Sequence, residues 1–210
     1  MTEALRHLRR VDPVMAQLIR RAGPYSIKAE RGAGAYEALV QAVAHQQLTG
    51  KAARTILGRF YALYGTDCCP EPSRLAETPD AALRSCGFSR AKTAALKDIA
   101  ARTLDGTIPP RRALARMKDA AIIARLIEAR GVGRWTVEMF LMFTLGRPDV
   151  LPVDDYGIRL GYKIAYDKRL LPKPKALAKI GERWAPYRTT ASWYLWRAVD
   201  LERAARGPAG

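Results

Sequence analysis

Along most of the chain, apolar side chains recur every three or four residues, the spacing that places them on one face of an α-helix. Residues 34–65 show this spacing with a break near Gln46–Gly50, which predicts two helices and a short connection. The same spacing predicts further helices over residues 12–23, 73–87, 89–106, 119–130, 134–146, 154–166 and 181–205. Strand-like alternation is scarce, and residues 148–156 are the one extended candidate. The pattern therefore predicts an all-α fold built from many short helices.

Local signals mark where several of these helices begin and end. An Asp-Pro pair at Asp12 is a typical helix start, and Gly23 is a typical helix end. Ser89 is the expected N-cap of the helix that follows it, and Ser73 is the expected start of another. A Thr-Pro-Asp sequence at 78–80 predicts that segment 73–87 contains a second helix start.

The composition adds a large positive charge to this helical pattern. The chain has 210 residues, of which 49% are hydrophobic, so it is long and apolar enough to bury a core. Lys and Arg number 36 against 20 Asp and Glu, a formal net charge of +16. Such an excess indicates a polyanionic partner, most often nucleic acid. The alternative is the general basicity of a ribosomal or tail-type protein, which the regular patterning of the chain disfavours.

Cysteine and histidine usage favours neither disulfides nor a metal site. The three cysteines are Cys68, Cys69 and Cys86, an odd number without a CxxC pair, so we expect no disulfide framework, zinc site or iron–sulfur cluster. His7 and His45 are the two histidines and match no catalytic arrangement. The first residues lack the apolar core of a signal peptide, and the longest apolar run is too short to span a bilayer. We therefore expect a cytoplasmic protein without a membrane partner.

Residues 131–136, GVGRWT, place two glycines between two predicted helices. Gly131 and Gly133 allow positive φ angles and leave the following backbone N–H groups uncovered. The start of a helix favours an anion, so a DNA phosphate fits there without a side chain and independently of base sequence. The alternative is an ordinary helix–helix corner in which glycine ends the first helix.

Four separated blocks resemble the helix–hairpin–helix DNA glycosylase superfamily. They are AHQQLTGKAA, GRWT, LPVDDY and ERWAPYRTTASWYLW, within residues 36–197, and together they are similar to the 3-methyladenine DNA glycosylase II branch. The resemblance implies two helical subdomains flanking a cleft. We expect a central subdomain over 36–150, with the helix–hairpin–helix at about 118–146, and a discontinuous subdomain formed by 1–35 and 151–210. We also expect a compact member that has only the helical core and no N-terminal β-rich domain.

The resemblance implies that Asp155 is the catalytic carboxylate. Cleavage of an N-glycosidic bond gives the sugar oxocarbenium character, which a carboxylate stabilises, or it orients the attacking water. Asp154 is the alternative, although we assign it to capping the next helix. Trp135 occupies the position at which strand-cleaving relatives carry a lysine that forms a Schiff base, so we expect a glycosylase without lyase activity.

Aromatic residues match the positions that line the base pocket of this branch. They are Trp135, Tyr156 and Trp196, and Met139 stands where the branch has a further aromatic residue. Aromatic faces attract cations, and purines alkylated at ring nitrogens are cationic. The alternative for each residue alone is core packing. Taken together, the positions predict a pocket for an alkylated base.

The remaining site residues are expected to contact DNA. The hairpin supplies Gly131, Gly133, Arg134 and Thr136, while Gln46 and Gln47 lie at a helix break that faces the minor groove by analogy. A base flipped out of the duplex leaves a gap, which amide or apolar side chains fill. The alternative for the glutamines is two solvated residues in a turn.

Together these inferences predict a monofunctional DNA glycosylase that excises alkylated, cationic purines from duplex DNA in base excision repair. We expect it to act as a monomer associated with the nucleoid and to need no organic cofactor, while the hairpin has room for a monovalent cation. One alternative is a mismatch uracil or thymine DNA glycosylase, whose neutral substrates gain less from aromatic faces. The other is a catalytically inactive DNA-binding protein of the same fold. The sequence leaves the preferred alkylated base open.

Overall fold

The computed structural model describes residues 2–30 and 32–206, which form two compact units. The first unit combines Met1–Ala29 with Gly146–Gly210, and the second unit is Glu30–Leu145. The second unit is thus an insertion between two parts of the first. The expected division into a central subdomain over 36–150 and a discontinuous subdomain over 1–35 and 151–210 stays a prediction.

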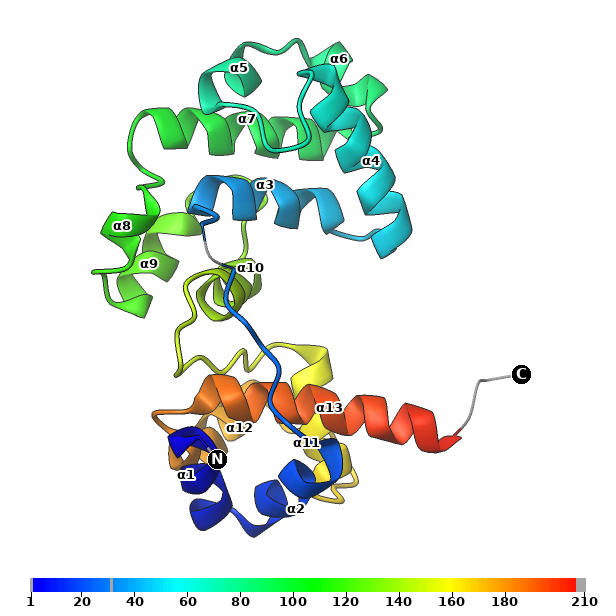
Figure 1. Cartoon of the computed structure of the whole chain (residues 1–210), viewed down its shortest axis with the longest axis vertical. Coiled ribbons are helices and arrows are strands. Elements are labelled where there is room, and N and C mark those ends of the chain that lie inside the picture. Colours follow the sequence, from blue (N-terminus) through cyan, green and yellow to red (C-terminus); the bar gives the residue numbers. More distant parts are fainter. Residues whose placement is uncertain (1, 31, 207–210) are drawn as a thin grey trace. The chain divides into compact units, whose positions relative to one another are not determined.

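The first unit is built from α-helices and one 3₁₀ turn (Figure 1). Its elements are α1 (Glu3–Val11), α2 (Pro13–Ala22), α11 (Tyr156–Ala165), α12 (Pro174–Gly181), the 3₁₀ turn η2 (Glu182–Trp184) and α13 (Arg188–Arg206). The long helix α13 packs against α11 and α2. The core of the first unit is therefore shared by the N-terminal helices and by the helices that follow residue 146.

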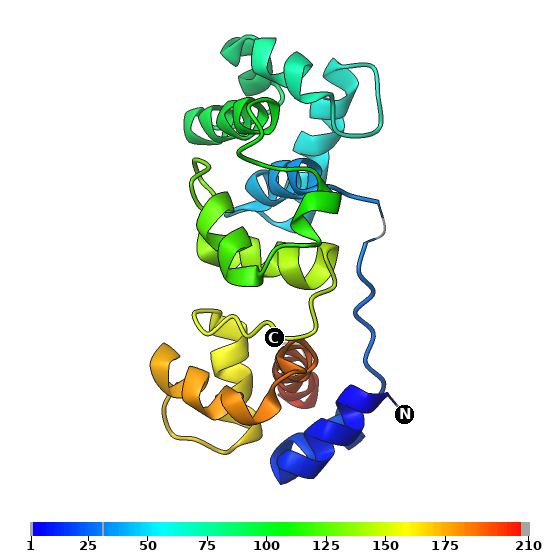
Figure 2. The ribbon, with the colours of Figure 1, turned by 90° about the vertical axis from the view of Figure 1, so that its left-hand side faces the viewer.

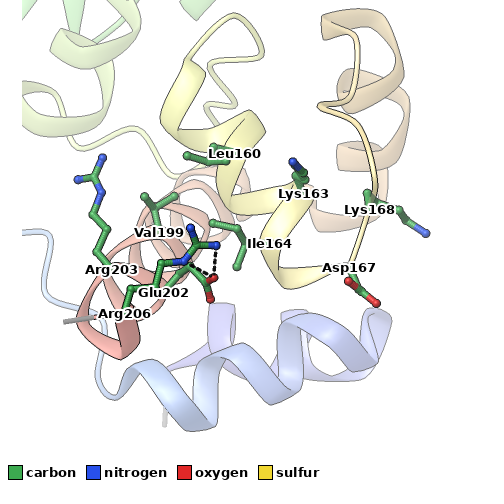
Figure 3. A pocket seen from close by; sticks show the side chains of 9 residues that line it. All are labelled: Leu160, Lys163, Ile164, Asp167, Lys168, Val199, Glu202, Arg203 and Arg206. Carbon is green, nitrogen blue, oxygen red and sulfur yellow. Dashed lines mark hydrogen bonds and ion pairs between the residues drawn. The ribbon is translucent and has the colours of Figure 1, made fainter. Parts of the chain in front are cut away.

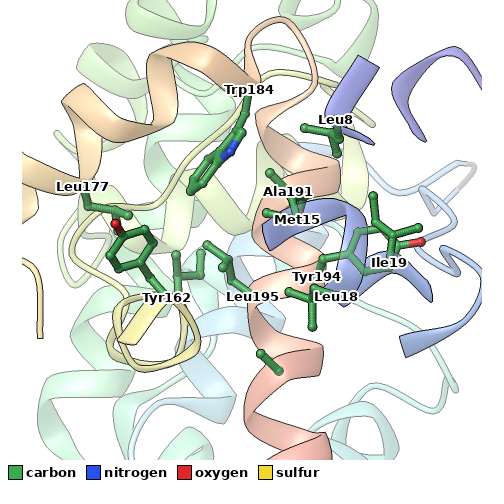
Figure 4. Packing of buried hydrophobic residues seen from close by; sticks show 12 residues of the cluster. Leu8, Met15, Leu18, Ile19, Tyr162, Leu177, Trp184, Ala191, Tyr194 and Leu195 are labelled. Carbon is green, nitrogen blue, oxygen red and sulfur yellow. The ribbon is translucent and has the colours of Figure 1, made fainter. Parts of the chain in front are cut away.

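The core of the first unit gathers side chains from both of its parts (Figure 4). Met15 and Leu18 of α2 meet Tyr194 and Leu195 of α13, and all four are buried. The buried carboxylate of Asp12 caps α2 by accepting from Val14 N and Met15 N, both at 3.1 Å. Its other oxygen accepts from Tyr166 Oη at 2.5 Å and from Trp184 Nε1 at 2.9 Å. Asp12 therefore satisfies polar groups from three elements within an apolar core.

The second unit contains the remaining helices, and α3 lies beside α7 in both views of the ribbon (Figures 1 and 2). Its elements are α3 (Ala35–His45), α4 (Gly50–Leu63), α5 (Pro72–Glu77), α6 (Asp80–Ser85), α7 (Arg90–Leu104), α8 (Arg111–Leu114), α9 (Asp119–Leu126), α10 (Arg134–Met139) and the π-helical turn η1 (Phe140–Thr144). Leu39 and Val43 of α3 and Leu96 and Ile99 of α7 are fully buried and form much of its core.

The all-α prediction is confirmed, and within residues 2–30 and 32–206 no strand occurs. Residues 148–156 are irregular backbone instead of a strand. The single helix expected over 181–205 is wrong, because η2 and a cis Ala185–Pro186 bond interrupt it before α13 begins. Ser73 is not a cap either, since Pro72 already opens α5 after Glu71. Ser89 and Asp12 cap their helices as predicted.

Candidate functional site

Asp155 is the N-cap of α11, in the first unit. Its Oδ1 accepts a hydrogen bond of 2.7 Å from Ile158 N, which satisfies one of the unpaired donors of the first turn. The expectation that Asp154 caps this helix is therefore wrong. Asp154 is exposed in the preceding turn, whereas the extended backbone at Asp155 points its carboxylate back over the helix start. Capping and the predicted catalytic role thus fall on the same side chain.

Trp196 of α13 reaches the same carboxylate oxygen. Its Nε1 donates to Asp155 Oδ1 at 2.9 Å, so one oxygen receives hydrogen bonds from two helices. Two glycines of α11 allow this approach, because a Cβ at Gly157 would lie 2.9 Å from Trp196 Cδ1 and one at Gly161 would collide with Leu195 O. Neither glycine was singled out from the sequence, although their spacing of four residues places them on one helix face.

Tyr156 directly follows Asp155 and is 63% exposed, while Trp196 is half-buried. Of the predicted site residues in the first unit, Trp196 thus contacts the carboxylate of Asp155, and the exposed Tyr156 is the next residue along the chain.

Arg188 helps to fix the start of α13, because it forms a two-pronged ion pair with Asp149 in which both N–O distances are 2.7 Å. These hydrogen bonds from Arg188 hold the pKa of Asp149 below its usual value.

The two hairpin glycines in the second unit differ in backbone conformation and in the space around them. Gly131 has φ +76°, a conformation that other residues rarely adopt, and a Cβ there would lie 3.0 Å from the Cβ of Ala95. Gly133 is the N-cap of α10 with φ −91°, and nothing lies within 4 Å of a Cβ placed on it. The prediction of a positive φ is confirmed for Gly131 and wrong for Gly133. Nothing within the described chain requires a glycine at 133.

Two long-range side-chain contacts hold the hairpin and the neighbouring turn. Asp98 of α7 accepts from Arg130 N at 2.7 Å and from Arg102 Nε at 2.8 Å. Gln46 Nε2 donates to Gly131 O at 2.9 Å, so the predicted glutamine turn is tied to the hairpin. A monovalent cation bound to that carbonyl would share it with the Gln46 amide. Asp98 was not identified from the sequence, because its Arg102 partner four residues on looks like an ordinary surface pair.

Lys92 fixes the turn that carries the two glutamines. Its Nζ donates to Ala44 O at 2.9 Å and to Gln46 O at 2.7 Å, at the C-terminal end of α3. Burial lowers the pKa of this lysine. Gln47 is exposed with φ +57°, and the next side chain, Leu48, is an exposed apolar residue at 39%. The turn therefore presents an amide and an apolar side chain to solvent.

The predicted residues of α10 have different surroundings. Trp135 is 47% exposed, and Arg134 Nε forms an ion pair of 2.9 Å with the buried Glu138. Thr136 is only 5% exposed, so its side chain belongs to the interior, and only its backbone remains a candidate for a phosphate contact. Thr136 and Met139 line a hollow of about 210 Å³ together with His45. The second unit thus groups Trp135 and Met139 on one short helix next to the hairpin.

A groove of about 510 Å³ lies along α11 and α13 in the first unit (Figure 3). Lys163, Lys168, Arg203 and Arg206 give it a basic lining, and Arg206 forms an ion pair of 2.7 Å with Glu202. None of the predicted site residues lines it. The groove is thus a basic surface on the same two helices that carry Tyr156 and Trp196.

Residues 2–30 and 32–206 contain neither a metal-binding cluster nor a membrane-spanning helix. In that part of the chain, no group of three or more His, Cys, Asp or Glu side chains is placed to hold a metal ion. None of the helices in the same ranges has the length and apolar character needed to cross a membrane.

Several known proteins are similar to this chain in both sequence and structure. DNA-3-methyladenine glycosylase 1 of Schizosaccharomyces pombe is 38% identical over 202 residues, which cover 96% of this chain and 89% of that protein. The solved 3-methyladenine DNA glycosylase of the same organism, in complex with abasic DNA, has a TM-score of 0.83 and 39% identity, with coverage of 93% of this chain and 96% of that chain. A DNA-3-methyladenine glycosidase from Bacillus halodurans has a TM-score of 0.87 and 32% identity, covering 98% and 92%.

Residues 40–186 match the HhH-GPD superfamily, described as base excision DNA repair proteins. This match spans the hairpin with Gly131 and Gly133 as well as the cap of α11 with Asp155. A family match over most of the chain, together with relatives above 30% identity along nearly all of it, shows that the chain belongs to the HhH-GPD superfamily of base excision DNA repair proteins.

Proposed function

We propose that this chain is a monofunctional DNA glycosylase that excises alkylated purines from duplex DNA. The observation that carries the proposal is the carboxylate of Asp155, which α11 and the indole of Trp196 in α13 hold in place, in a chain of the HhH-GPD superfamily. The relatives named above are 3-methyladenine DNA glycosylases, and one was solved with abasic DNA, the product of base excision. We infer that the enzyme acts as a monomer on the chromosome in the cytoplasm.

In the proposed reaction, the N-glycosidic bond breaks and the base leaves with the bonding electrons. The sugar then carries positive charge shared between C1′ and the ring oxygen, and water adds to C1′ and loses a proton. Asp155 stabilises this charge or orients the water, because a fixed negative group near developing positive charge lowers the barrier. A purine alkylated at N3 or N7 is already cationic and leaves as a neutral base. The reaction therefore needs no organic cofactor.

The aromatic residues supply the proposed affinity for the damaged base. Trp135, Tyr156 and Trp196 have partly or largely exposed rings, and aromatic faces attract cations. Met139 adds a flexible apolar side chain that adapts to different ring shapes. Neutral, undamaged purines gain less from such surfaces. We therefore assign the preference for alkylated bases to this set of residues.

DNA binding is assigned to the hairpin and the glutamine turn. The backbone N–H groups after Gly133 face an approaching phosphate without a side chain, and the partly exposed guanidinium of Arg134 adds positive charge nearby. Gln46 braces the hairpin through its bond to Gly131, so we assign the gap left by the flipped base to Gln47 and Leu48. Leu48 extends the set predicted from the sequence.

The test is the substitution Asp155→Asn in single-turnover excision of 7-methylguanine or 3-methyladenine from an oligonucleotide duplex. Asparagine is also a good N-cap, so the start of α11 is retained while the negative charge is removed. We expect a loss of about 100-fold or more in rate, the usual effect of losing one electrostatic stabiliser. Binding to DNA should persist, because a charge that repels phosphate has been removed.

The matched control is Asp154→Asn, which removes the same charge one residue earlier from an exposed side chain. We expect near-normal excision from this control. An Asp155→Asn enzyme that excises at the unmodified rate would refute the catalytic assignment. A panel of single lesions, assayed for abasic sites, would identify the preferred base, and exclusive release of uracil or thymine from mismatches would point to the neutral-substrate alternative.

A further inference from the structure

Oδ1 of Asp155 is held by two donors from different helices. Ile158 N of α11 donates at 2.7 Å and Trp196 Nε1 of α13 donates at 2.9 Å. The backbone bond alone leaves the carboxylate able to turn about its χ angles, as at any exposed N-cap. A second donor from another element restricts that rotation, because both hydrogen bonds keep good geometry in only one orientation. The indole therefore has a contact that fixes the direction of the carboxylate.

Gly157 of α11 leaves room for the contact between Trp196 and Asp155. A Cβ on Gly157 would lie 2.9 Å from Trp196 Cδ1 and 3.1 Å from both Trp196 Nε1 and Asp155 Oδ1. Gly157 is the second residue of α11 and has no positive φ angle, so its backbone conformation does not require glycine. The space that its missing side chain leaves is the space in which the indole meets the carboxylate.

We propose that Trp196 is a positioning residue for Asp155, acting through its indole N–H, and that Gly157 keeps the space in which this hydrogen bond forms. The inference rests on the proposed catalytic role of Asp155. It gives Trp196 a second task, in addition to the stacking on the flipped base proposed above. Positioning acts on the common step, the stabilisation of the sugar cation, whereas stacking depends on which base occupies the pocket.

The two tasks are separated by Trp196→Phe and Trp196→Leu, assayed on a cationic lesion, 7-methylguanine, and on a neutral one, hypoxanthine. Phenylalanine keeps an aromatic face and loses the N–H, while leucine loses both. If Trp196 positions Asp155, both variants lose about tenfold to a hundredfold in the maximal single-turnover rate, the size expected for a hydrogen bond to a charged group. For Trp196→Phe the loss is similar for both lesions, and the enzyme concentration that gives half the maximal rate stays within about twofold. Trp196→Leu loses further activity on the cationic lesion, because it also removes the aromatic face.

Trp193→Phe is the matched control on the same helix. The Trp193 ring packs edge-on against Tyr25, with ring centroids 5.3 Å apart, in the first unit's core region. This substitution makes the same change of side chain three residues earlier on α13, away from Asp155. We expect it to leave the excision rate on both lesions unchanged. A loss equal to that of Trp196→Phe would show that α13 is merely sensitive to substitution and would overturn the inference.

Gly157→Ala disturbs the same hydrogen bond without changing the Trp196 side chain. The added methyl group would lie 2.9 Å from Trp196 Cδ1 and 3.1 Å from both atoms of the hydrogen bond, so the indole and the carboxylate must move apart. We expect a rate loss within about threefold of that of Trp196→Phe. The double variant should be no slower than the slower single variant, because two changes that break one contact are not additive. If the rate loss of the double variant equals the product of the two single losses, the two substitutions do not act on one shared contact.

The outcomes keep this inference separate from the proposed function. If Asp155→Asn is inactive while Trp196→Phe excises both lesions at the normal rate, the positioning role is refuted and the function stands. If Trp196→Phe is normal and Trp196→Leu loses only the cationic lesion, Trp196 stacks on the base and does not position the carboxylate. If Asp155→Asn is fully active, the catalytic assignment of Asp155 fails and the positioning role of Trp196 fails with it. If the unmodified protein releases no base from any lesion of the panel, the proposed function itself fails.

Discussion

At the scale of single side chains, the proposed chemistry depends on the carboxylate of Asp155 and on the indole of Trp135. Asp155 was singled out for catalysis, but its capping of α11 was assigned to Asp154, because adjacent carboxylates cannot be distinguished by type. The backbone angles of the turn decide which of the two points at the helix start. Trp135 is a simpler case, since an indole cannot act as an amine whatever its geometry. Its chemical consequence follows from residue identity alone.

The first prediction is therefore about the product of the reaction. Trp135 stands where lyase members of the superfamily use a lysine, so the proposed enzyme should leave an intact strand with an abasic site. Incubation of the protein with lesion-containing duplex and borohydride should trap no covalent protein–DNA adduct. Strand breaks should appear only after treatment with alkali. Efficient trapping would mean that another amine attacks the sugar and that the role assigned to position 135 is wrong.

At the scale of elements, the sequence predicted those features that neighbouring residues determine. Ser89 before α7 and Asp12 before α2 were identified because a cap and its helix are adjacent in sequence. The turn from α10 into the π-helical η1 was not predicted, since an apolar segment looks the same for both helix types. Lys92 and Asp98 were also missed. Their partners in the glutamine turn and the hairpin lie more than 30 residues away, where no local pattern reports them.

The two hairpin glycines give the second prediction, because the fold needs one of them and not the other. Alanine at 131 must adopt a φ of +76° and lie 3.0 Å from Ala95 Cβ, so Gly131→Ala should lower stability by about 1 kcal/mol or more. A Cβ at 133 meets no atom within 4 Å in the described residues, and the change costs only what alanine loses to glycine as an N-cap. Gly133→Ala should therefore lose less stability than Gly131→Ala and yet bind DNA more weakly than the unmodified protein.

Thermal unfolding and duplex binding of the two variants check this prediction. Binding by Gly133→Ala should weaken by a similar factor for damaged and undamaged duplexes, because phosphate contacts carry no base information. If folded Gly133→Ala loses only its preference for the lesion and keeps affinity for undamaged DNA, the hairpin is a structural corner. The phosphate contacts must then come from the basic helices.

At the scale of the whole molecule, the net charge of +16 follows directly from the amino-acid composition. Charge predicts how strongly a polyanion is attracted, but not which surface it meets. The hairpin and the basic groove of Figure 3 are both candidates, and composition does not distinguish them. The prediction that unites them concerns ionic strength, since each phosphate contact releases bound counterions.

We expect the affinity of the unmodified protein for undamaged duplex to fall steeply with salt. Each neutralised phosphate should add roughly −0.9 to the slope of log affinity against log salt. Fluorescence anisotropy at several salt concentrations measures this slope directly. Gly133→Ala should make the slope shallower by no more than about one such contact. A slope near zero for the unmodified protein would contradict the proposal that phosphate contacts dominate binding.

The insertion of the second unit between the two parts of the first also has a consequence for synthesis on the ribosome. Every contact within Glu30–Leu145 can form once that continuous stretch has emerged. Met15 and Leu18, in contrast, must wait for Tyr194 and Leu195 of α13. At typical translation speeds this wait is on the order of 10 to 30 s, during which the apolar faces of α1 and α2 lack their cover. A nascent chain halted before α13 would carry a complete hairpin and an Asp155 without Trp196.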